Sequence, residues 1–177
     1  GLVFQLYEKN GVVKRDEVDK IVKLIPHEER KKLWGMGIKI GRYHIYLPKM
    51  LKPKAVEFRI SLWNLFHNLS GKNSIPKSGL NFLVDAKLEK SFLLLCGFEK
   101  FKEFFVRIDI LEKLFIKIID STKDKKFKIN ASMMNLLGCS KENFLKLMNY
   151  MNYKKDKEEN TYIFKGEKKK KEKLFKF

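Results

Sequence analysis

The side chains in this sequence that could do chemistry are mainly cations, and they are better suited to holding phosphate groups than to catalysis. The chain contains 39 lysine and arginine residues against 21 aspartate and glutamate residues, which gives a formal net charge of +18. An excess of this size favours a polyanionic partner, nucleic acid before an anionic membrane surface. Lysine supplies nearly all of the positive charge, however, and such a bias is also typical of an AT-rich genome. The charge therefore supports a nucleic-acid partner without being sufficient evidence for one.

Two groups of cations and amides are placed where they could meet a nucleic acid. The first group surrounds the end of a predicted strand and two prolines, Pro48 and Pro53, which could present a rigid basic edge. The second group lies on the outer face of a predicted helix and on the hairpin after it, where it could contact phosphates and base edges. The candidate nucleic-acid-binding residues are Arg42, Lys49, Lys52, Lys54, Asn143, Lys146, Asn149, Lys154, Lys155 and Lys157. The alternative for both groups is a solvated, charged surface that keeps the protein soluble.

No catalytic or metal-binding motif accompanies these cations. The segment GKNS at 71–74 lacks the spacing and the preceding strand that a phosphate-binding glycine loop requires. His27, His44 and His67 lie far apart, and no cysteine or carboxylate stands near them at metal-ligand spacing. His44 falls in a predicted strand, where a surface or half-buried side chain is its expected role. We therefore expect no cofactor, no metal ion and no catalytic residue in this chain.

The cysteines and the start of the chain indicate the cellular compartment. Cys96 and Cys139 are isolated, so no disulfide framework is predicted and a reducing, cytoplasmic location is expected. The opening GLVFQLYEKN is too short and too polar for a signal peptide, and no apolar run has the length of a membrane span. Residues 2–7 have the pattern of the end of a helix, so we expect the chain to be a piece of a longer protein.

Residues 1–70 are expected to form a helix-rich subdomain with one bulged strand. A predicted helix over 16–25 is followed by a second one over 27–34, which ends at a glycine. The alternation of apolar residues over 38–47 slips at Gly41, which predicts a bulged strand. A further helix is predicted over 53–69. Its predicted buried stripe is Ala55, Phe58, Leu62, Leu65, Phe66 and Leu69.

Residues 80–165, after a polar boundary segment at 70–79, are expected to form a winged-helix-like subdomain. A helix over 87–95 and a strand over 104–107 are predicted first. Asp109 with Glu112 has the spacing of a capping box at the start of the helix that follows this strand. The predicted elements that follow are a strand over 127–130, a helix over 131–137, a turn at 138–139, a helix capped by Ser140 with Phe144, Leu147, Met148 and Met151 inward, and a hairpin of 153–156 with 161–164.

This order of helix, strand, helix, turn, helix and hairpin is that of a winged helix. A winged helix contains a helix-turn-helix motif, and the second helix of that motif usually contacts nucleic acid. The alternative is a small α+β bundle of no particular class. The predicted fold class is therefore α+β and mainly helical, with a basic tail at 166–177.

Several stretches of this chain resemble the C-terminal accessory region of a bacterial DExH-type helicase of superfamily two, a family similar to the mitochondrial degradosome RNA helicase. They are VFQLYEKNGVV (3–13), LWGMGIKIGRYHIYLPKMLKPKAVEFRISLW (33–63), FVRIDILEKL (105–114) and MMNLLGCSKENFLKLMNYMNY (133–153). The resemblance implies an accessory end of an ATP-dependent helicase whose motor motifs lie upstream, so it transfers no catalytic residue. The lysine-rich tail departs from the arginine-rich tails expected of the family.

The expected function is therefore nucleic-acid binding, with RNA before DNA, in support of helicase motor domains in the same polypeptide. The chain is expected to be a monomer without a membrane partner and not an enzyme on its own. One alternative is a protein-interaction module that docks a nuclease or another partner to the helicase, for which binding would depend less on salt. Another is a free-standing winged-helix regulator, which would dimerise on palindromic DNA.

Overall fold

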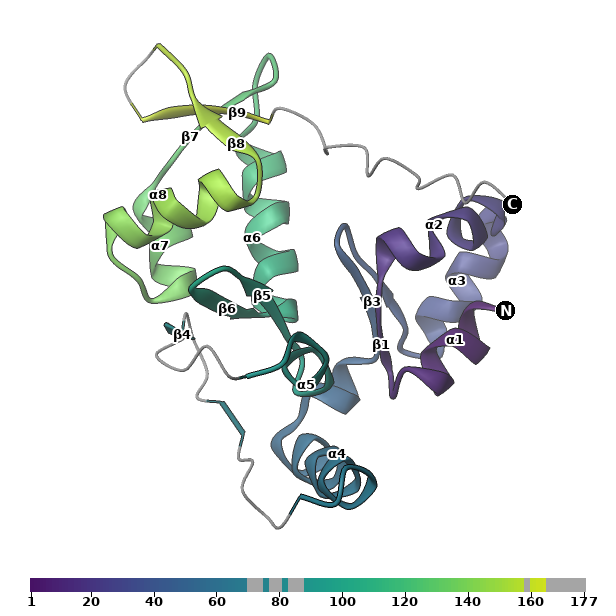
Figure 1. Ribbon diagram of the computed structural model, residues 1–177. Coiled ribbons are helices and arrows are strands. Elements are labelled where there is room, and N and C mark those ends of the chain that lie inside the picture. Colours follow the sequence, from purple (N-terminus) through teal and green to yellow (C-terminus); the bar gives the residue numbers. More distant parts are fainter. Residues whose placement is uncertain (70–74, 77–80, 83–87, 158–159, 165–177) are drawn as a thin grey trace, which may run out of the picture.

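The computed structural model describes residues 1–69, 75–76, 81–82, 88–157 and 160–164. It shows an α+β protein with three small antiparallel sheets (Figure 1). The strand orders are β1-β3-β2, β4-β6-β5 and β7-β9-β8, so in each sheet the strand that comes last in the chain lies in the middle. We name the three parts by their sheets: a first unit over 2–46, a middle unit over 53–107 and a last unit over 108–164.

The first unit consists of three helices and a three-stranded sheet. Its elements are α1 (Leu2–Glu8), β1 (Val12–Lys14), α2 (Arg15–Leu24), α3 (His27–Gly35), β2 (Lys39–Ile40) and β3 (His44–Tyr46). The helical face predicted for α2 is confirmed, because Val18 and Val22 are buried and Ile21 and Ile25 pack against the same core. That core also contains side chains from α1 and β3, and Leu33 of α3 packs against it, so the sheet and the helices share one apolar centre.

The prediction of one bulged strand over 38–47 is wrong, because β2 and β3 are the two arms of a hairpin. Ile40 lies opposite Ile45 in antiparallel register, and the Gly41 amide donates to the His44 carbonyl at 2.8 Å. The slip in the apolar alternation therefore marks a turn, since the two halves of the pattern pair with each other. The turn is stabilised from outside the hairpin by a carboxylate of the last unit, as described below.

The buried stripe predicted for the helix over 53–69 is also wrong. After a 3-10 turn, η1 (Pro48–Leu51), the helix α4 (Pro53–Phe66) buries a different face, that of Val56, Arg59 and Ile60. The Arg59 guanidinium donates to the backbone carbonyls of Asn10 (3.0 Å) and Met50, and these bonds hold this face against the first unit. The predicted members Phe58, Leu62, Leu65, Phe66 and Leu69 are exposed instead.

The middle unit continues with β4 (Asn81–Phe82), α5 (Lys90–Leu95), β5 (Phe98–Phe101) and β6 (Phe104–Arg107). The strand predicted over 104–107 is confirmed, and the helix predicted over 87–95 begins at Lys90 within the described residues. Gly97 joins α5 to β5 with φ +84, and a Cβ there would lie 2.6 Å from Leu51 Cδ2. A glycine is thus required where this turn meets η1. The predicted boundary 70–79 lies largely outside the described residues, and so do the GKNS segment and the tail 166–177.

The last unit has the same order of elements as the first. Its elements are α6 (Ile108–Ser121), β7 (Lys126–Lys128), α7 (Ala131–Leu137), α8 (Lys141–Tyr150), β8 (Tyr153–Lys155) and β9 (Thr161–Phe164). The predicted helices and the hairpin are confirmed, and so is the inward face of α8, because Phe144, Leu147, Met148 and Met151 are buried. Gly138 ends α7 in the left-handed region (φ 63), and the Ser140 hydroxyl caps α8 by accepting from the Asn143 amide at 3.3 Å.

The predicted capping box at the start of α6 is wrong. The helix begins at Ile108 with Arg107 at its N-cap, so Asp109 lies inside the first turn. Asp109 accepts from the Arg107 guanidinium at 2.7 Å, and Glu112 points away from the helix end toward the first unit. Asp109 is therefore engaged by the side chain of the N-cap residue and by the Ile110 amide, and Glu112 by amides of the first unit, so the two carboxylates do not form a capping box.

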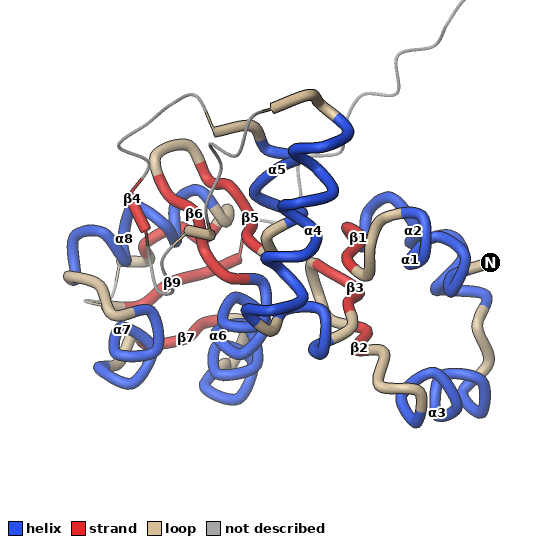
Figure 2. Tube along the Cα trace, turned by 90° about the horizontal axis from the view of Figure 1, so that it is seen from below, coloured by secondary structure: helices blue, strands red, loops and turns tan. Residues whose placement is uncertain are grey.

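The first and last units lie on opposite sides of the molecule, with α5 and the β5–β6 hairpin between them (Figures 1 and 2). In both views α3 and α8 lie toward opposite ends of the molecule. Among the described residues, no helix combines the length and the apolar character that crossing a membrane would require.

Candidate nucleic-acid interface

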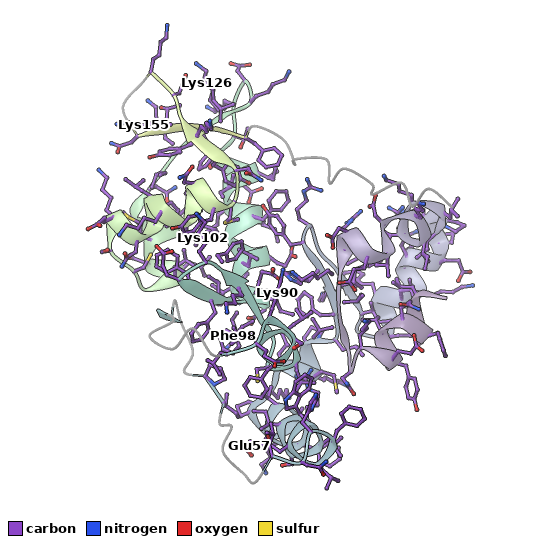
Figure 3. The ribbon with its side chains drawn as sticks, in the orientation of Figure 1. Glu57, Lys90, Phe98, Lys102, Lys126 and Lys155 are labelled. Carbon is purple, nitrogen blue, oxygen red and sulfur yellow. The ribbon has the colours of Figure 1, made fainter. Side chains whose placement is uncertain are left out.

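The sheet of the last unit carries a row of lysines on one of its faces. Lys126 on β7 and Lys154 on β8 both lie opposite Ile163 of the central strand, and residues directly opposite in a ladder share a face. Lys128 follows Lys126 by two positions on β7 and therefore points to the same side. Figure 3 shows Lys126 and Lys155 at this end of the molecule. A sheet face with this arrangement suits a negatively charged backbone better than a protein core.

Most of the positive charge on this sheet is not neutralised within the described part of the chain. Lys126 pairs with Asp156 at 2.6 Å. Five further lysines of the same region are exposed and have no ion pair among the described residues: Lys123, Lys125, Lys128, Lys154 and Lys155. Since neighbouring like charges repel one another, such a surface gains from a polyanion that lies across it.

Three of the four lysines on α2 and α3, in contrast, have acidic partners within about one helical turn. Lys23 pairs with Asp19 at 2.5 Å, Lys31 with Glu28 at 3.1 Å, and Lys32 with Glu29 at 2.7 Å. The Lys23 ammonium also lowers the pKa of the Asp19 carboxyl, chiefly by its hydrogen bond. The fields of these pairs largely cancel at a distance, so α2 and α3 attract a phosphate backbone less than the last unit does.

The outer face of α8 contains the predicted candidates, but an acidic side chain is among them. Lys146 and Asn149 are exposed as expected, and Asn143 is half-buried. The Lys146 ammonium lies 2.9 Å from the Glu142 carboxylate, whose hydrogen bond raises the pKa of Lys146. This face therefore supplies polar groups for base edges with little net charge, and the sheet supplies most of the charge.

The hairpin candidates lie where the sequence predicts them. Lys154 and Lys155 belong to β8, and Lys157 is exposed at the beginning of the turn that follows. The residues at 158–159, in the middle of the predicted hairpin loop, lie outside the described part of the chain.

The candidates Arg42, Lys49, Lys52 and Lys54 do not form one basic edge. Arg42 lies in the turn of the β2–β3 hairpin, with its guanidinium carbon 6.0 Å from the centre of the Phe115 ring of α6. Lys49, Lys52 and Lys54 are exposed on η1 and the start of α4, beyond the opposite end of β3. Arg42 is therefore next to the last unit, and the three lysines are separated from it by the length of the strand.

Sequence reasoning missed the lysines that precede and form β7. Lys123 and Lys126 exchange two backbone hydrogen bonds of 2.8 Å, and the two residues between them, Asp124 (φ 49) and Lys125 (φ 64), are both left-handed. Two such residues define the tight hairpin turn that matches strand twist. The charge run KDKKFK at 123–128, beside a predicted strand, was the signal that could have identified this part of the interface.

The hairpin that carries Arg42 is held by a buried carboxylate of α6. Glu112 accepts hydrogen bonds from the amides of Arg42 (2.7 Å), Tyr43 (2.8 Å) and His44 (2.9 Å). Burial disfavours the charged carboxylate, but the hydrogen bonds outweigh the effect of burial and lower the pKa of Glu112. A Cβ at Gly41 would lie 2.4 Å from this carboxyl group, so only glycine allows the approach. The position of Arg42 against the last unit follows from this contact.

His44 is buried beside the same carboxylate, so the prediction of a surface or half-buried histidine is wrong. Its Nε2 lies 2.9 Å from Glu99 Oε2, and Glu99 also pairs with Lys14. Burial lowers the pKa of His44, but the neighbouring carboxylates of Glu112 and Glu99 outweigh it and raise the pKa above its usual value. Side chains from all three units therefore meet in one buried charge cluster, defined by Lys14, His44, Glu99 and Glu112.

Neither metal chemistry nor thiol chemistry is indicated at these positions. Among the described residues, no group of three or more histidine, cysteine, aspartate and glutamate side chains could hold a metal ion. Burial raises the pKa of Cys96 to about 12 and also raises the pKa of Cys139, so both thiols are disfavoured as thiolate nucleophiles.

Comparison of the chain with models of protein families, with curated proteins and with solved structures found no match.

Proposed function

We propose that the chain binds nucleic acid through its last unit, and that this unit is a winged helix. The order α6, β7, α7, α8, β8, β9 and the strand order β7-β9-β8 support this assignment. Gly138 and Ser140 form the turn between α7 and α8, as in a helix-turn-helix. In this arrangement α8 is the helix that approaches the nucleic acid and the β8–β9 hairpin is the wing.

The observation that carries the proposal is the set of five lysines on and beside the third sheet without an ion pair among the described residues. Together with the resemblance stated above, it supports an accessory role beside a DExH helicase motor, with RNA as the substrate before DNA. The chain holds the strand in this role, and ATP hydrolysis belongs to motor domains that this chain does not contain.

A salt titration tests this proposal. Fluorescence anisotropy with a short single-stranded RNA is measured from low to moderate salt, for the protein and for a variant with Lys128, Lys154 and Lys155 changed to alanine. If each lysine releases one counterion, the slope of log K against log salt should flatten by roughly two units, at about 0.7 per contact. The matched control changes Lys23, Lys31 and Lys32 to alanine, which removes the same charge from ion pairs of the first unit.

The control variant is expected to retain the slope of the unmodified protein. Equal slopes for all three proteins would place the contact surface elsewhere, and the absence of salt-dependent binding in the unmodified protein would refute the proposed function. Circular dichroism on both variants shows whether the fold is retained.

A docking function is the second candidate, because α4 exposes a stripe of large apolar side chains. Phe58 is 65%, Leu65 is 75% and Phe66 is 83% exposed. Contiguous apolar surface of this kind often marks a protein contact site. We propose that the helicase motor in the same polypeptide is the partner of this stripe. Changing Phe58 and Leu65 to serine should weaken association with the motor domains and leave the RNA salt slope unchanged.

A further inference from the structure

An aromatic cavity lies where the β2–β3 hairpin turn meets the last unit. Its volume is about 360 Å³, which falls within the range of roughly 300–1,000 Å³ for small-ligand sites. Tyr43 comes from the hairpin turn, Phe115 from α6, and Tyr153 and Phe164 from the third sheet. The cavity therefore exists only because the first and last units are held together.

The aromatic walls are positioned by contacts among themselves. The rings of Tyr43 and Phe115 meet edge to face with centroids 5.6 Å apart, and those of Tyr153 and Phe164 lie 5.3 Å apart. The Tyr43 and Tyr153 side chains both line the cavity, and each affects the pKa of the other. Burial, reinforced by Tyr153, raises the pKa of Tyr43, so its hydroxyl stays protonated. The cavity is thus preformed, with two phenol groups available for polar contacts.

The charged side chains that line the cavity are both cations. Arg42 lies over the Phe115 ring, and Lys125 projects from the tight turn before β7. Among the described lining residues there is no carboxylate. Aromatic walls with cations and no carboxylate favour a planar ligand that carries negative charge.

Part of the apolar lining is open to solvent. Ile119 is 53% and Phe164 is 37% exposed, although both line the cavity. A planar ring inserted between Ile119 and the aromatic walls would cover this surface and gain stacking energy.

We propose that this cavity binds one unstacked base of a single-stranded nucleic acid, with Arg42 and Lys125 contacting the adjoining phosphates. The inference rests on the proposed function and adds a strand preference to it. Lys125 leads directly into β7, and Tyr153 begins β8, so the cavity adjoins the strands that carry the lysine row, on the opposite face of the sheet from that row. Paired bases are stacked inside a duplex and cannot enter, so the site selects single strands.

The test fills the cavity at an exposed position. In the variant Ile119→Trp a bulky ring occupies the space proposed for the base. The matched control is Ile116→Trp on the same helix, at a position that is 57% exposed and does not line the cavity. Affinities for a 12-nucleotide single-stranded RNA and for a duplex of the same sequence are measured by anisotropy. Quenching of a single 2-aminopurine in the strand reports stacking.

The Ile119→Trp variant is expected to lose about tenfold in single-strand affinity, which is within the effect of one stacked base. The quenching should disappear, whereas duplex affinity and the salt slope should stay as in the control. If both variants bind single strands as the unmodified protein does, the cavity assignment is overturned and nucleic-acid binding stands. If the unmodified protein binds neither RNA, the proposed function itself fails.

A competition measurement distinguishes a base in a strand from a free nucleotide. Adenosine monophosphate is titrated against the bound, fluorescent 12-nucleotide RNA. Retention of the RNA at mononucleotide concentrations a thousandfold above its own supports the strand assignment, because the lysine row contributes only when the phosphates are linked. Displacement at comparable concentrations overturns it in favour of a free-nucleotide site.

Discussion

The first and last units follow the same order of helices and strands, but the third helix of each is held in a different way. In the last unit, α8 buries Phe144, Leu147 and Met148 in the core. In the first unit, α3 buries no residue, and the Arg30 guanidinium connects it to the Val22 and Ile25 carbonyls at 3.1 and 3.0 Å. The same succession of elements therefore produces one helix with a fully buried face and one whose apolar contact with the core comes from the partly buried Leu33 and is supplemented by the Arg30 hydrogen bonds.

The two units also differ in how many of their lysines form ion pairs with carboxylates. Three of the four lysines of α2 and α3 are paired with nearby carboxylates, whereas five lysines on and beside the third sheet face solvent without an ion pair in the described chain. This difference separates the two units as candidate nucleic-acid sites better than their topology does. It also explains why the total charge of the sequence does not locate the candidate interface.

Removing one large side chain from α8 and one from α3 should produce the largest difference in stability between the two units. Phe144 is completely buried, so Phe144→Ala should lower the free energy of unfolding by about 3–5 kcal/mol through lost burial and a residual cavity. Trp34 on α3 is 65% exposed and interacts with Lys39, so Trp34→Ala should lower it by less than about 1 kcal/mol. Urea denaturation of both variants measures the difference. Equal losses would mean that α3 is packed as tightly as α8.

The contact between the units can be weakened at Glu112 without removing volume. Glu112→Gln places an NH2 group against three backbone amides that need an acceptor, so at least one hydrogen bond is lost. The expected loss of unfolding free energy is about 2–3 kcal/mol. The control Glu57→Gln, at an exposed position on α4 (Figure 3), should leave stability unchanged. A similar effect at both positions would argue against a special role for the buried carboxylate.

The local structure of the last unit could be predicted from sequence because its signals are short-range. The spacing of three and four between Phe144, Leu147, Met148 and Met151 and the Ser140 cap indicate both the extent of α8 and its buried face. The hairpin follows from alternation over a few residues. None of these inferences requires knowledge of distant contacts.

The wrong predictions concern residues whose positions are determined by contacts with distant parts of the chain. The apolar residues of α4 surround the helix, so their pattern does not specify a face, and the buried Arg59 is explained only by its backbone acceptors at Asn10 and Met50. Glu112 has the spacing of a capping residue, but its partners lie about 70 positions earlier in the chain. The placement of Arg42 depends on this contact and could not be predicted either.

Alanine substitutions at two glycines near helix ends should have smaller effects on stability. Gly138 has φ 63 between α7 and α8, so Gly138→Ala should lower the unfolding free energy by about 1–2 kcal/mol through backbone strain alone, since nothing lies within 4 Å of the added Cβ. Gly35, at the end of α3, is helical and equally open, so Gly35→Ala should stabilise by about 0.5 kcal/mol. Thermal melts of both variants show whether each substitution raises or lowers the stability. The left-handed residue after α3 is Gly37 (φ 87), so destabilisation at Gly35 would contradict the view that Gly35 is an ordinary helical position.

The smallest expected effect is a pH dependence that arises where the units meet. Since Glu99 and Glu112 raise the pKa of His44 in the folded protein, its contribution is complete below the unfolded value of about 6.5 and is lost as the pH rises through the folded pKa. The lowered pKa values of Glu99 and Glu112 act oppositely: their contribution is present above about 4.5 and is lost at lower pH. The cluster therefore stabilises most between these limits. His44→Gln should lower the melting temperature more at pH 5.5 than at pH 8.5, whereas a constant difference would show that the imidazole does not change its protonation state between these pH values.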